Sequence, residues 1–272
     1  MKERYRELAE WGKTPGEAMD RLTKIVSLLR KECPWDKAQT HESLITNMIE
    51  EAYEAVEAIK NGDMENLNEE LGDVVLQASL HSEIASERND FNIVSVLNCE
   101  ADKMIRRHPH IFSEYEAKTI DKVLEKWENI KDDEHNKPLC SEKIKKVPKS
   151  LPGLMRADKV QGKAAKVGFD WEDATGAIDK FHEETQEFMD EYRRGDKDKM
   201  KEELGDLLFS IVNVARLLDI DPEEAITLTT EKFIRRFTYV EEKALANNQE
   251  LDKMTLDEMD LLWNEAKSFE KK

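Results

Sequence analysis

Apolar residues recur at helical spacing along most of this chain. The segment Thr14-Pro15-Gly16-Glu17 combines an N-cap, a proline in the first turn and a capping-box glutamate. The stripe that follows consists of Met19, Leu22, Val26 and Leu29, at intervals of three and four residues, which is the spacing of one helix face. Extended runs that alternate apolar and polar residues are absent, and glycine is scarce. The pattern therefore predicts an all-α fold.

The same periodicity predicts further helices on either side of a break. Two of them have capped starts, at Asp221-Pro222-Glu223-Glu224 and at Thr255-Leu256-Asp257-Glu258. The expected helices span about residues 42–60, 64–86, 91–107, 119–131, 154–166, 175–193, 197–218, 222–247 and 255–267. Between them, residues 132–153 are rich in lysine and hold three of the seven prolines. We therefore expect a module at 1–131, a linker at 132–153 and a second module at 154–272.

The two halves carry the same acidic pattern in the same register. Each residue of the first set recurs 133 positions later, and so do two glycines, Gly62 and Gly72, as Gly195 and Gly205. One Glu-Glu-x-x-Glu motif would indicate little, because 60 of 272 residues are acidic. Five acids at one offset indicate an internal duplication. The paired acids are Glu50, Glu51, Glu54, Glu70 and Asp73, then Glu183, Glu184, Glu187, Glu203 and Asp206.

These acids are spaced to converge. Residues three or four apart share a helix face, so Glu51 and Glu54 project from one helix, and Glu70 and Asp73 project from the next. A turn around Gly62, matched by one around Gly195, folds the second helix back on the first. We expect the acids to be interleaved with core positions, namely Ala52, Ala55, Val56, Ile59, Leu71, Val74, Val75 and Ala78. Carboxylates at the edge of a core need a partner.

A cation is one such partner. A set of carboxylates without His or Cys suits a hard ion such as Mg²⁺, with Mn²⁺ as a possible substitute, whereas a di-iron bundle would need Glu-x-x-His. The alternative without a metal is a solvated acidic helix face, which is common in a chain with 38% charged residues. The duplication favours the metal site.

A basic cluster and a tryptophan are also duplicated. The first copies are Lys103, Arg106, Arg107, Trp127 and Lys131, and the second copies are Lys232, Arg235, Arg236, Trp263 and Lys267. Cationic side chains can contact phosphate oxygens and an indole can stack on a nucleobase. The alternatives are a solvated basic face and a tryptophan that anchors the core.

Composition excludes several classes of partner. The net charge of −18 and the pI near 4.9 argue against binding of a nucleic acid polymer, which needs a basic stripe. The three cysteines show no metal-binding spacing and are typical of reduced thiols in the cytoplasm. No apolar segment resembles a secretion signal or a membrane span, so we expect a cytoplasmic protein.

Together these motifs resemble those of the MazG family of nucleoside triphosphate pyrophosphohydrolases over essentially the full length. The acidic pair is the signature of the all-α NTP pyrophosphohydrolase superfamily. The segments specific to MazG are Cys33-Pro34-Trp35-Asp36-Lys37, Lys103-Met104-Ile105-Arg106-Arg107-His108-Pro109-His110, Leu151-Pro152-Gly153-Leu154-Met155-Arg156-Ala157 and Val167-Gly168-Phe169-Asp170-Trp171. The resemblance implies tandem helical modules, a homodimer built through four-helix bundles, Mg²⁺ dependence, and hydrolysis of NTP or dNTP to NMP and pyrophosphate. We expect a role in nucleotide-pool housekeeping or regulation, and little restriction by base, because stacking on Trp263 would suit any base.

The resemblance also implies site residues. The family's metal ligands fall on Glu184, Glu187, Glu203 and Asp206, with Glu51, Glu54, Glu70 and Asp73 as their counterparts. Its nucleotide contacts fall on Lys180, Glu183, Lys201, Lys232, Arg235, Arg236 and Trp263, with Lys267 as an addition. We assign the general base to Glu183.

One asymmetry separates the halves. Lys180 and Lys201 are replaced in the first half by Asn47 and Asn68, and a neutral amide cannot offset the charge of a triphosphate as an ammonium does. The second module is therefore expected to be the main catalyst, unless these surface positions simply drifted.

Two rival functions remain. One is a different pyrophosphohydrolase of the same superfamily, of the dUTPase or phosphoribosyl-ATP type, against which the MazG-specific segments argue. The other is a helical regulatory protein that senses Mg²⁺ or Ca²⁺ without chemistry, although the chain has no EF-hand loop.

Overall fold

The structure is a computed structural model that describes residues 3–134 and 136–270. It divides into two compact units, Met1–Glu134 and His135–Lys272. All regular secondary structure in the described residues is helical, which confirms the predicted all-α fold. None of these helices is long and apolar enough to span a membrane.

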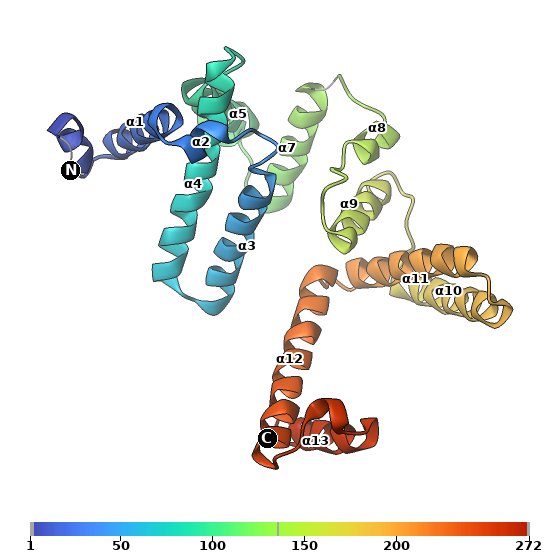
Figure 1. Cartoon of the computed structure of the whole chain (residues 1–272). Helices are drawn as coiled ribbons and strands as arrows, with labels where there is room; N and C mark the ends of the chain where they lie inside the picture. Colours follow the sequence, from blue (N-terminus) through green and yellow to red (C-terminus); the bar gives the residue numbers. More distant parts are fainter. Residues whose placement is uncertain (1–2, 135, 271–272) are drawn as a thin grey trace. The chain divides into compact units, whose positions relative to one another are not determined.

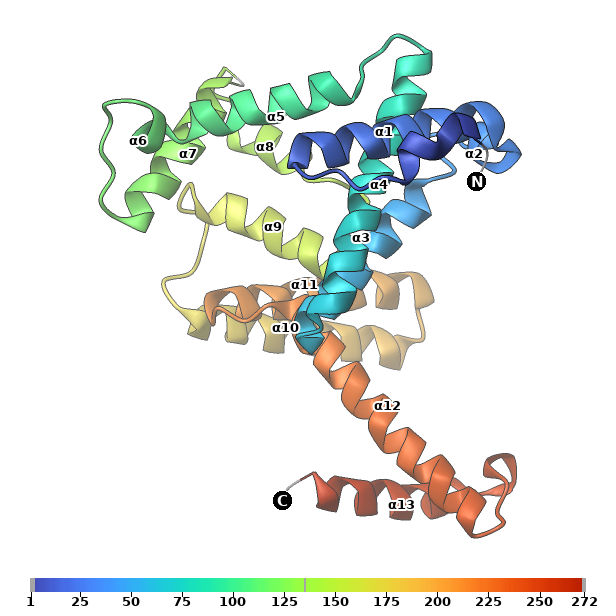
Figure 2. The same ribbon diagram turned by 90° about the vertical axis from the view of Figure 1, so that its left-hand side faces the viewer.

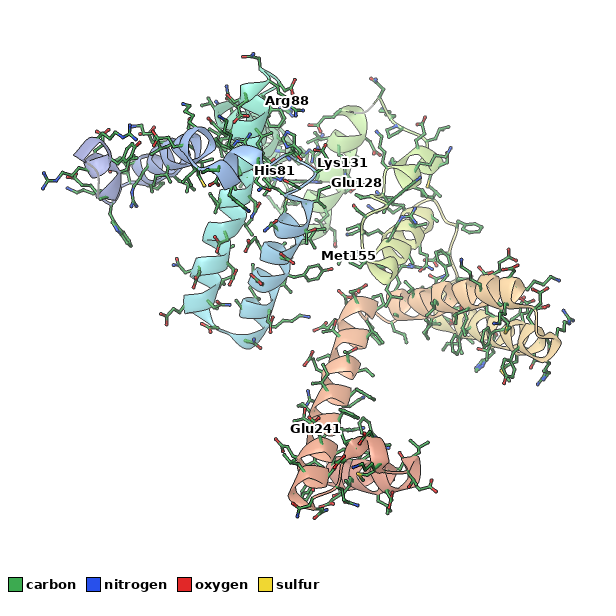
Figure 3. The ribbon with its side chains drawn as sticks, in the orientation of Figure 1. His81, Arg88, Glu128, Lys131, Met155 and Glu241 are labelled. Atoms are coloured by element: carbon green, nitrogen blue, oxygen red, sulfur yellow. The ribbon has the colours of Figure 1, made fainter. Side chains whose placement is uncertain are left out.

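The N-terminal unit is organised around the hairpin of α3 (Ile45–Asn61) and α4 (Met64–Glu87). Helix α1 packs against α4, and α7 packs against α5 (Figure 1). His81 on α4, labelled in Figure 3, stacks on His41 with 5.1 Å between ring centroids and so ties the segment before α3 to α4. The other elements are η1 (Glu3–Ala9), α1 (Pro15–Glu32), α2 (Pro34–Ala38), α5 (Ile93–Arg107), α6 (Pro109–Phe112) and α7 (Ile120–Glu134).

The C-terminal unit repeats this plan. Helices α10 (Ala174–Arg194) and α11 (Lys197–Leu217) form the hairpin, and α9 (Gly153–Ala165) packs on α11 as α1 packs on α4. Helix α12 (Pro222–Ala246) leads away from the hairpin, and α13 (Leu256–Phe269) folds back and packs on α12 (Figure 1, Figure 2). The backbone N–H of Met155, labelled in Figure 3, donates to Glu223 Oε2 at 3.2 Å and links α9 to the start of α12.

Short elements escaped the sequence pattern. They are α2, α6, η1, η2 (Leu251–Lys253) and α8 (Cys140–Lys145), and each is too short to show a periodic stripe. Helix α8 lies in the segment expected to be a linker, where it packs against α9. The expected lapse of helical structure over residues 132–153 is therefore wrong for this stretch.

The three capped helix starts predicted from the sequence are confirmed. Thr14 Oγ1 accepts from the Glu17 N–H at 3.2 Å, and Asp221 Oδ1 accepts from the N–H groups of the first turn of α12. Thr255 and Glu258 form a reciprocal capping box. At α1 the box is modified, because the Glu17 carboxylate accepts from the Lys13 N–H rather than from that of the N-cap. These caps satisfy N–H groups that would otherwise lack partners.

The two hairpin turns share one geometry. Gly62 and Gly195 end α3 and α10 with φ values of 66° and 76°, a left-handed conformation that favours glycine. Asp63 and Asp196 then cap α4 and α11 by accepting the N–H three residues on. The predicted turns are thus confirmed, and they set the two helices of each hairpin antiparallel.

The predicted core is only partly correct. Of the apolar positions among the first set of acids, Ala55 is buried, whereas Val56, Ile59, Leu71 and Val75 are exposed. The reason is that a two-helix hairpin covers one stripe of each helix, and the helix that supplies a third layer, α1, meets only part of α4. The buried cluster of this unit lies nearer that contact and consists of Val26, Leu44, Leu80 and Ile84.

Candidate functional site

The acids of the C-terminal unit converge between α10 and α11. Carboxylate oxygens of Glu184, Glu187 and Glu203 all lie within 4.8 Å of one another. Asp206 lies outside this group but is close enough for its charge to act on Glu203. Burial, followed by the charges of Glu187 and Asp206, raises the pKa of Glu203.

The acids of the N-terminal unit converge in the same way. Oxygens of Glu51, Glu70 and Asp73 lie within 4.8 Å of one another, and Glu54 is close enough for its charge to act on Glu70. Burial raises the pKa of Glu51 and of Glu70, and neighbouring carboxylates add to both effects. Gln77, which no sequence motif indicated, donates to Glu51 Oε1 at 3.5 Å.

Both clusters suit a hard divalent cation. Each offers only carboxylate oxygens. Burial is the main cause that raises the pKa of Glu51 and of Glu203, and repulsion from neighbouring ionised carboxylates raises both pKa values further. A cation would remove this repulsion, and oxygen ligands without nitrogen or sulfur match the preference of Mg²⁺ and Mn²⁺. The residues present therefore fit the metal that the sequence pattern predicts.

Lys180 distinguishes the second cluster from the first. Its Nζ lies 2.8 Å from Glu183 Oε1 and 2.6 Å from Glu184 Oε1, and these hydrogen bonds raise its pKa. Glu184 is 6% exposed, so this ion pair reaches the edge of the core. Lys201 is exposed on α11, and Glu183 is exposed beside Lys180. Asn47 occupies the position equivalent to Lys180 and carries no charge.

The basic clusters hold pairs of helices together. Arg236 donates to Glu270 Oε2 at 2.8 Å from Nε, and its guanidinium lies 5.6 Å from the ring centroid of Trp263. Trp263 also contacts Phe233, with 5.1 Å between ring centroids. The first unit repeats this arrangement with Arg107, Glu134 and Trp127, where the cation lies 5.5 Å from the ring. The duplication therefore includes Glu134 and Glu270, which sequence comparison missed.

In the C-terminal unit, the basic cluster and Trp263 lie apart from the carboxylates of the same chain. Lys232, Arg235 and Arg236 belong to α12, while Trp263 and Lys267 belong to α13, which packs on α12. Helix α12 leads away from the α10–α11 hairpin in both views (Figure 1, Figure 2). The structure thus brings Glu184, Glu187, Glu203 and Lys180 together, but leaves the predicted basic residues of α12 and α13 on a separate surface.

A cavity of about 590 Å³ adjoins the C-terminal acids. Its lining includes Lys180, Glu184 and Asp206, together with groups that sequence reasoning did not assign. These groups include Gln161 on α9, Asn213 and Arg216 on α11, and Phe169 and Trp171 in the segment before α10. The segment Val167-Gly168-Phe169-Asp170-Trp171 stands out in the sequence, but only the structure shows that it forms a wall beside the acids.

Comparison with known proteins agrees with this site. The family model of the MazG nucleotide pyrophosphohydrolase domain matches residues 39–112 and again residues 173–240, which include both acidic clusters. The chain is 39% identical to a nucleoside triphosphate pyrophosphohydrolase of Escherichia coli over 257 residues, covering 93% of this chain and 98% of that protein. It is 40% identical to a nucleoside triphosphate pyrophosphohydrolase/pyrophosphatase MazG of Thermotoga maritima, covering 94% and 98% of the two chains.

A solved structure shows a weaker likeness. The crystal structure of a mazG-related protein from Thermotoga maritima is 28% identical and covers 42% of this chain and 98% of its own, with a TM-score of 0.38. The twofold match of the family model and the two full-length relatives, by contrast, include both acidic hairpins. The chain therefore belongs to the MazG nucleotide pyrophosphohydrolase family.

Proposed function

We propose that this protein hydrolyses nucleoside triphosphates, including deoxynucleotides, to the monophosphate and pyrophosphate, with Mg²⁺ as cofactor and little restriction by base. Nucleotide-pool housekeeping or regulation is the corresponding cellular role. The observation that carries the proposal is the oxygen-only cluster of Glu184, Glu187 and Glu203 beside Lys180 and a cavity. Family membership and the names of the full-length relatives support the same reaction.

The residues have distinct roles in this reaction. Glu184, Glu187, Glu203 and Asp206 would hold the metal, which supplies Lewis-acid stabilisation of the triphosphate charge. Lys180 and Lys201 neutralise phosphate oxygens. Because the protein forms no covalent bond with the substrate in this reaction, positioning and charge stabilisation supply most of the rate enhancement.

Glu183 is the proposed general base. A water molecule attacks the α-phosphorus, its proton passes to the Glu183 carboxylate, and the bond from the α-phosphorus to the bridging oxygen breaks, so that pyrophosphate leaves. In the structure Lys180 holds Glu183 Oε1 at 2.8 Å and Glu184 Oε1 at 2.6 Å, so one cation orients both the base and a metal ligand.

Homodimerisation is part of the proposal. Leu204 and Leu208 on α11 are 44% and 49% exposed, and their equivalents Leu71 and Val75 on α4 are 51% and 39% exposed. Apolar positions left open at the same register in both hairpins suit burial against helices of a second copy as a four-helix bundle. A second copy could also bring the basic surface of α12 and α13 to the carboxylates. Light scattering of the purified protein should give twice the mass of one chain.

The decisive experiment measures pyrophosphate release from a mixed panel of NTPs and dNTPs. Release should require Mg²⁺ and stop with EDTA, and Asp206→Asn should remove turnover while circular dichroism shows an intact fold, because the substitution removes a charge and keeps the shape. Metal binding without any pyrophosphate release would favour a sensor instead. Release from dUTP or phosphoribosyl-ATP alone would identify one of the related enzymes.

A further inference from the structure

The cavity beside the C-terminal acids has walls that the proposed chemistry does not use. Its volume of about 590 Å³ lies within the range of roughly 300–1,000 Å³ typical of small-molecule sites. Lys180, Glu184 and Asp206 contribute to the lining and connect the cavity to the metal cluster. The remaining lining includes two amides and three aromatic rings, which have no role in holding a metal or a phosphate.

Gln161 lines this cavity and carries a hydrogen-bond acceptor that is unused. The side chain is 6% exposed, and its Nε2 donates to the backbone oxygen of Phe209 at 2.8 Å. Its Oε1 is buried and has no hydrogen-bond partner among the residues that the structure describes. A buried acceptor without a partner is costly, so a ligand with an N–H group at this position would satisfy it.

Asn213 presents the complementary donor. The side chain is 8% exposed, and its Oδ1 accepts from Arg216 Nε at 3.0 Å and from Arg216 Nη2 at 2.6 Å. The same Nη2 donates to Asp170 Oδ1 at 2.5 Å, which fixes the arginine between α11 and the segment before α10. With Oδ1 engaged, the group that Asn213 can offer to a ligand is its Nδ2 amine.

Trp171 supplies a flat apolar wall. The indole lies against the first turn of α10, where a Cβ at Gly176 would collide with the ring, so the glycine makes room for it. Phe169 lies in the same wall and is exposed. A ligand that suits one acceptor, one donor and an aromatic wall is itself a flat heteroaromatic ring with hydrogen-bonding groups on its edge, as a nucleobase is. Every nucleobase carries both an N–H donor and an acceptor on its edge, so these groups do not restrict the site to one base.

The N-terminal unit lacks this set of groups. At the offset of 133 residues that relates the two halves, Gln161, Trp171 and Asn213 correspond to Leu28, Ala38 and Leu80. Leu80 is 4% exposed and belongs to the apolar core with Val26 and Leu44. The duplicated hairpin therefore retains its acids but has neither amide nor ring at these three positions; its buried amide, Gln77, corresponds instead to Ser210.

We propose that the cavity binds the nucleobase of the substrate through Gln161, Asn213 and Trp171, and that this recognition is confined to the C-terminal half. The inference rests on the proposed function, since the triphosphate must lie at the acids for the base to reach the cavity. It assigns base binding to a site other than Trp263, whose ring is in contact with Phe233 and Arg236 in this chain.

Binding without turnover tests the proposal independently of hydrolysis. We would measure Mg²⁺-dependent binding of α,β-methylene ATP and of inorganic tripolyphosphate, a probe without a base, to the full chain. Gln161→Met and Asn213→Leu should each weaken binding of the nucleotide analogue about tenfold, the effect of one hydrogen bond, and leave tripolyphosphate binding unchanged. Asn98→Leu, an exposed asparagine on α5, is the matched control and should change neither.

The results of this binding experiment test the base pocket separately from the hydrolysis. Unchanged binding of the analogue, or an equal loss for both probes, would overturn the base pocket. Selective loss of analogue binding in a protein that releases no pyrophosphate would support the pocket while refuting the proposed hydrolysis.

Photolabelling of the wild-type protein avoids any variant that fails to fold. Irradiation with 8-azido-ATP and Mg²⁺, followed by peptide mapping, should place the label within residues 160–171 or 206–216, and an excess of ATP should prevent it. Labels confined to the peptides of α12 and α13, or to the N-terminal unit, would overturn the assignment.

Discussion

Replacement of Lys180 by asparagine tests the asymmetry between the two halves most directly. The substitution places at position 180 the residue that the first half has at position 47. In the structure it removes the ammonium 2.8 Å from Glu183 Oε1 and 2.6 Å from Glu184 Oε1. The four acids assigned to the metal are unaltered. The variant therefore separates the contribution of the cation from that of the metal ligands.

The size of the effect follows from Coulomb's law. A unit charge about 5 Å from a phosphate charge contributes roughly 3 kcal/mol at an effective dielectric constant of about 20. The Lys180 side chain is 38% exposed, so solvent screening reduces this to about half. Because about 1.4 kcal/mol corresponds to a factor of ten in rate, we expect kcat/KM to fall roughly ten- to thirtyfold.

Initial rates of pyrophosphate release provide the assay, with Lys180→Arg as the variant that keeps the charge and Asn47→Lys as the control in the other half. Lys180→Arg should retain most of the activity, and Asn47→Lys should not lower it. The affinity for Mg²⁺ should not weaken in Lys180→Asn, because removal of a cation leaves the cluster more negative. An unchanged kcat/KM, or a loss explained by weaker Mg²⁺ binding, would refute the charge argument.

Three further outcomes are expected. Glu184→Gln should abolish nearly all NTP hydrolysis and Glu51→Gln little of it, because the C-terminal cluster has Lys180 beside it where the N-terminal cluster has Asn47; equal losses would show that the halves share the work. Hydrolysis in ¹⁸O-labelled water should place the label in NMP, since water attacks the α-phosphorus, and label in inorganic phosphate would contradict the proposed reaction. The third concerns stability: burial and neighbouring acids raise the pKa of Glu203 above its ordinary value of 4.5, so its ionisation opposes folding as pH rises through that range. In EDTA, Glu203→Gln should therefore raise Tm at pH 7 but not at pH 4, and it should weaken the rise of Tm with Mg²⁺; a lower Tm at pH 7 would contradict this.

Several features could be predicted from the sequence because they depend on neighbours in the chain. The helical stripes, the caps at Thr14, Asp221 and Thr255, and the glycine turns at Gly62 and Gly195 involve contacts within a few residues. Convergence of the acids also follows from local rules, since i, i+3 spacing on two antiparallel helices brings them together. Family membership was evident from motifs of the same kind.

Other features depended on contacts between distant segments. No periodicity indicates that Gln161, Asn213 and Trp171 line one cavity, because they come from α9, α11 and the segment before α10. Nor does the pattern show that Arg236 is engaged by Glu270, or that Val56 and Ile59 remain exposed in one chain. An apolar position marks a side chain that gains from burial, but only the tertiary packing decides which surface covers it. The sequence by itself thus determined the helices and the acidic clusters, and the tertiary structure decided what surrounds each cluster and so how the two halves differ.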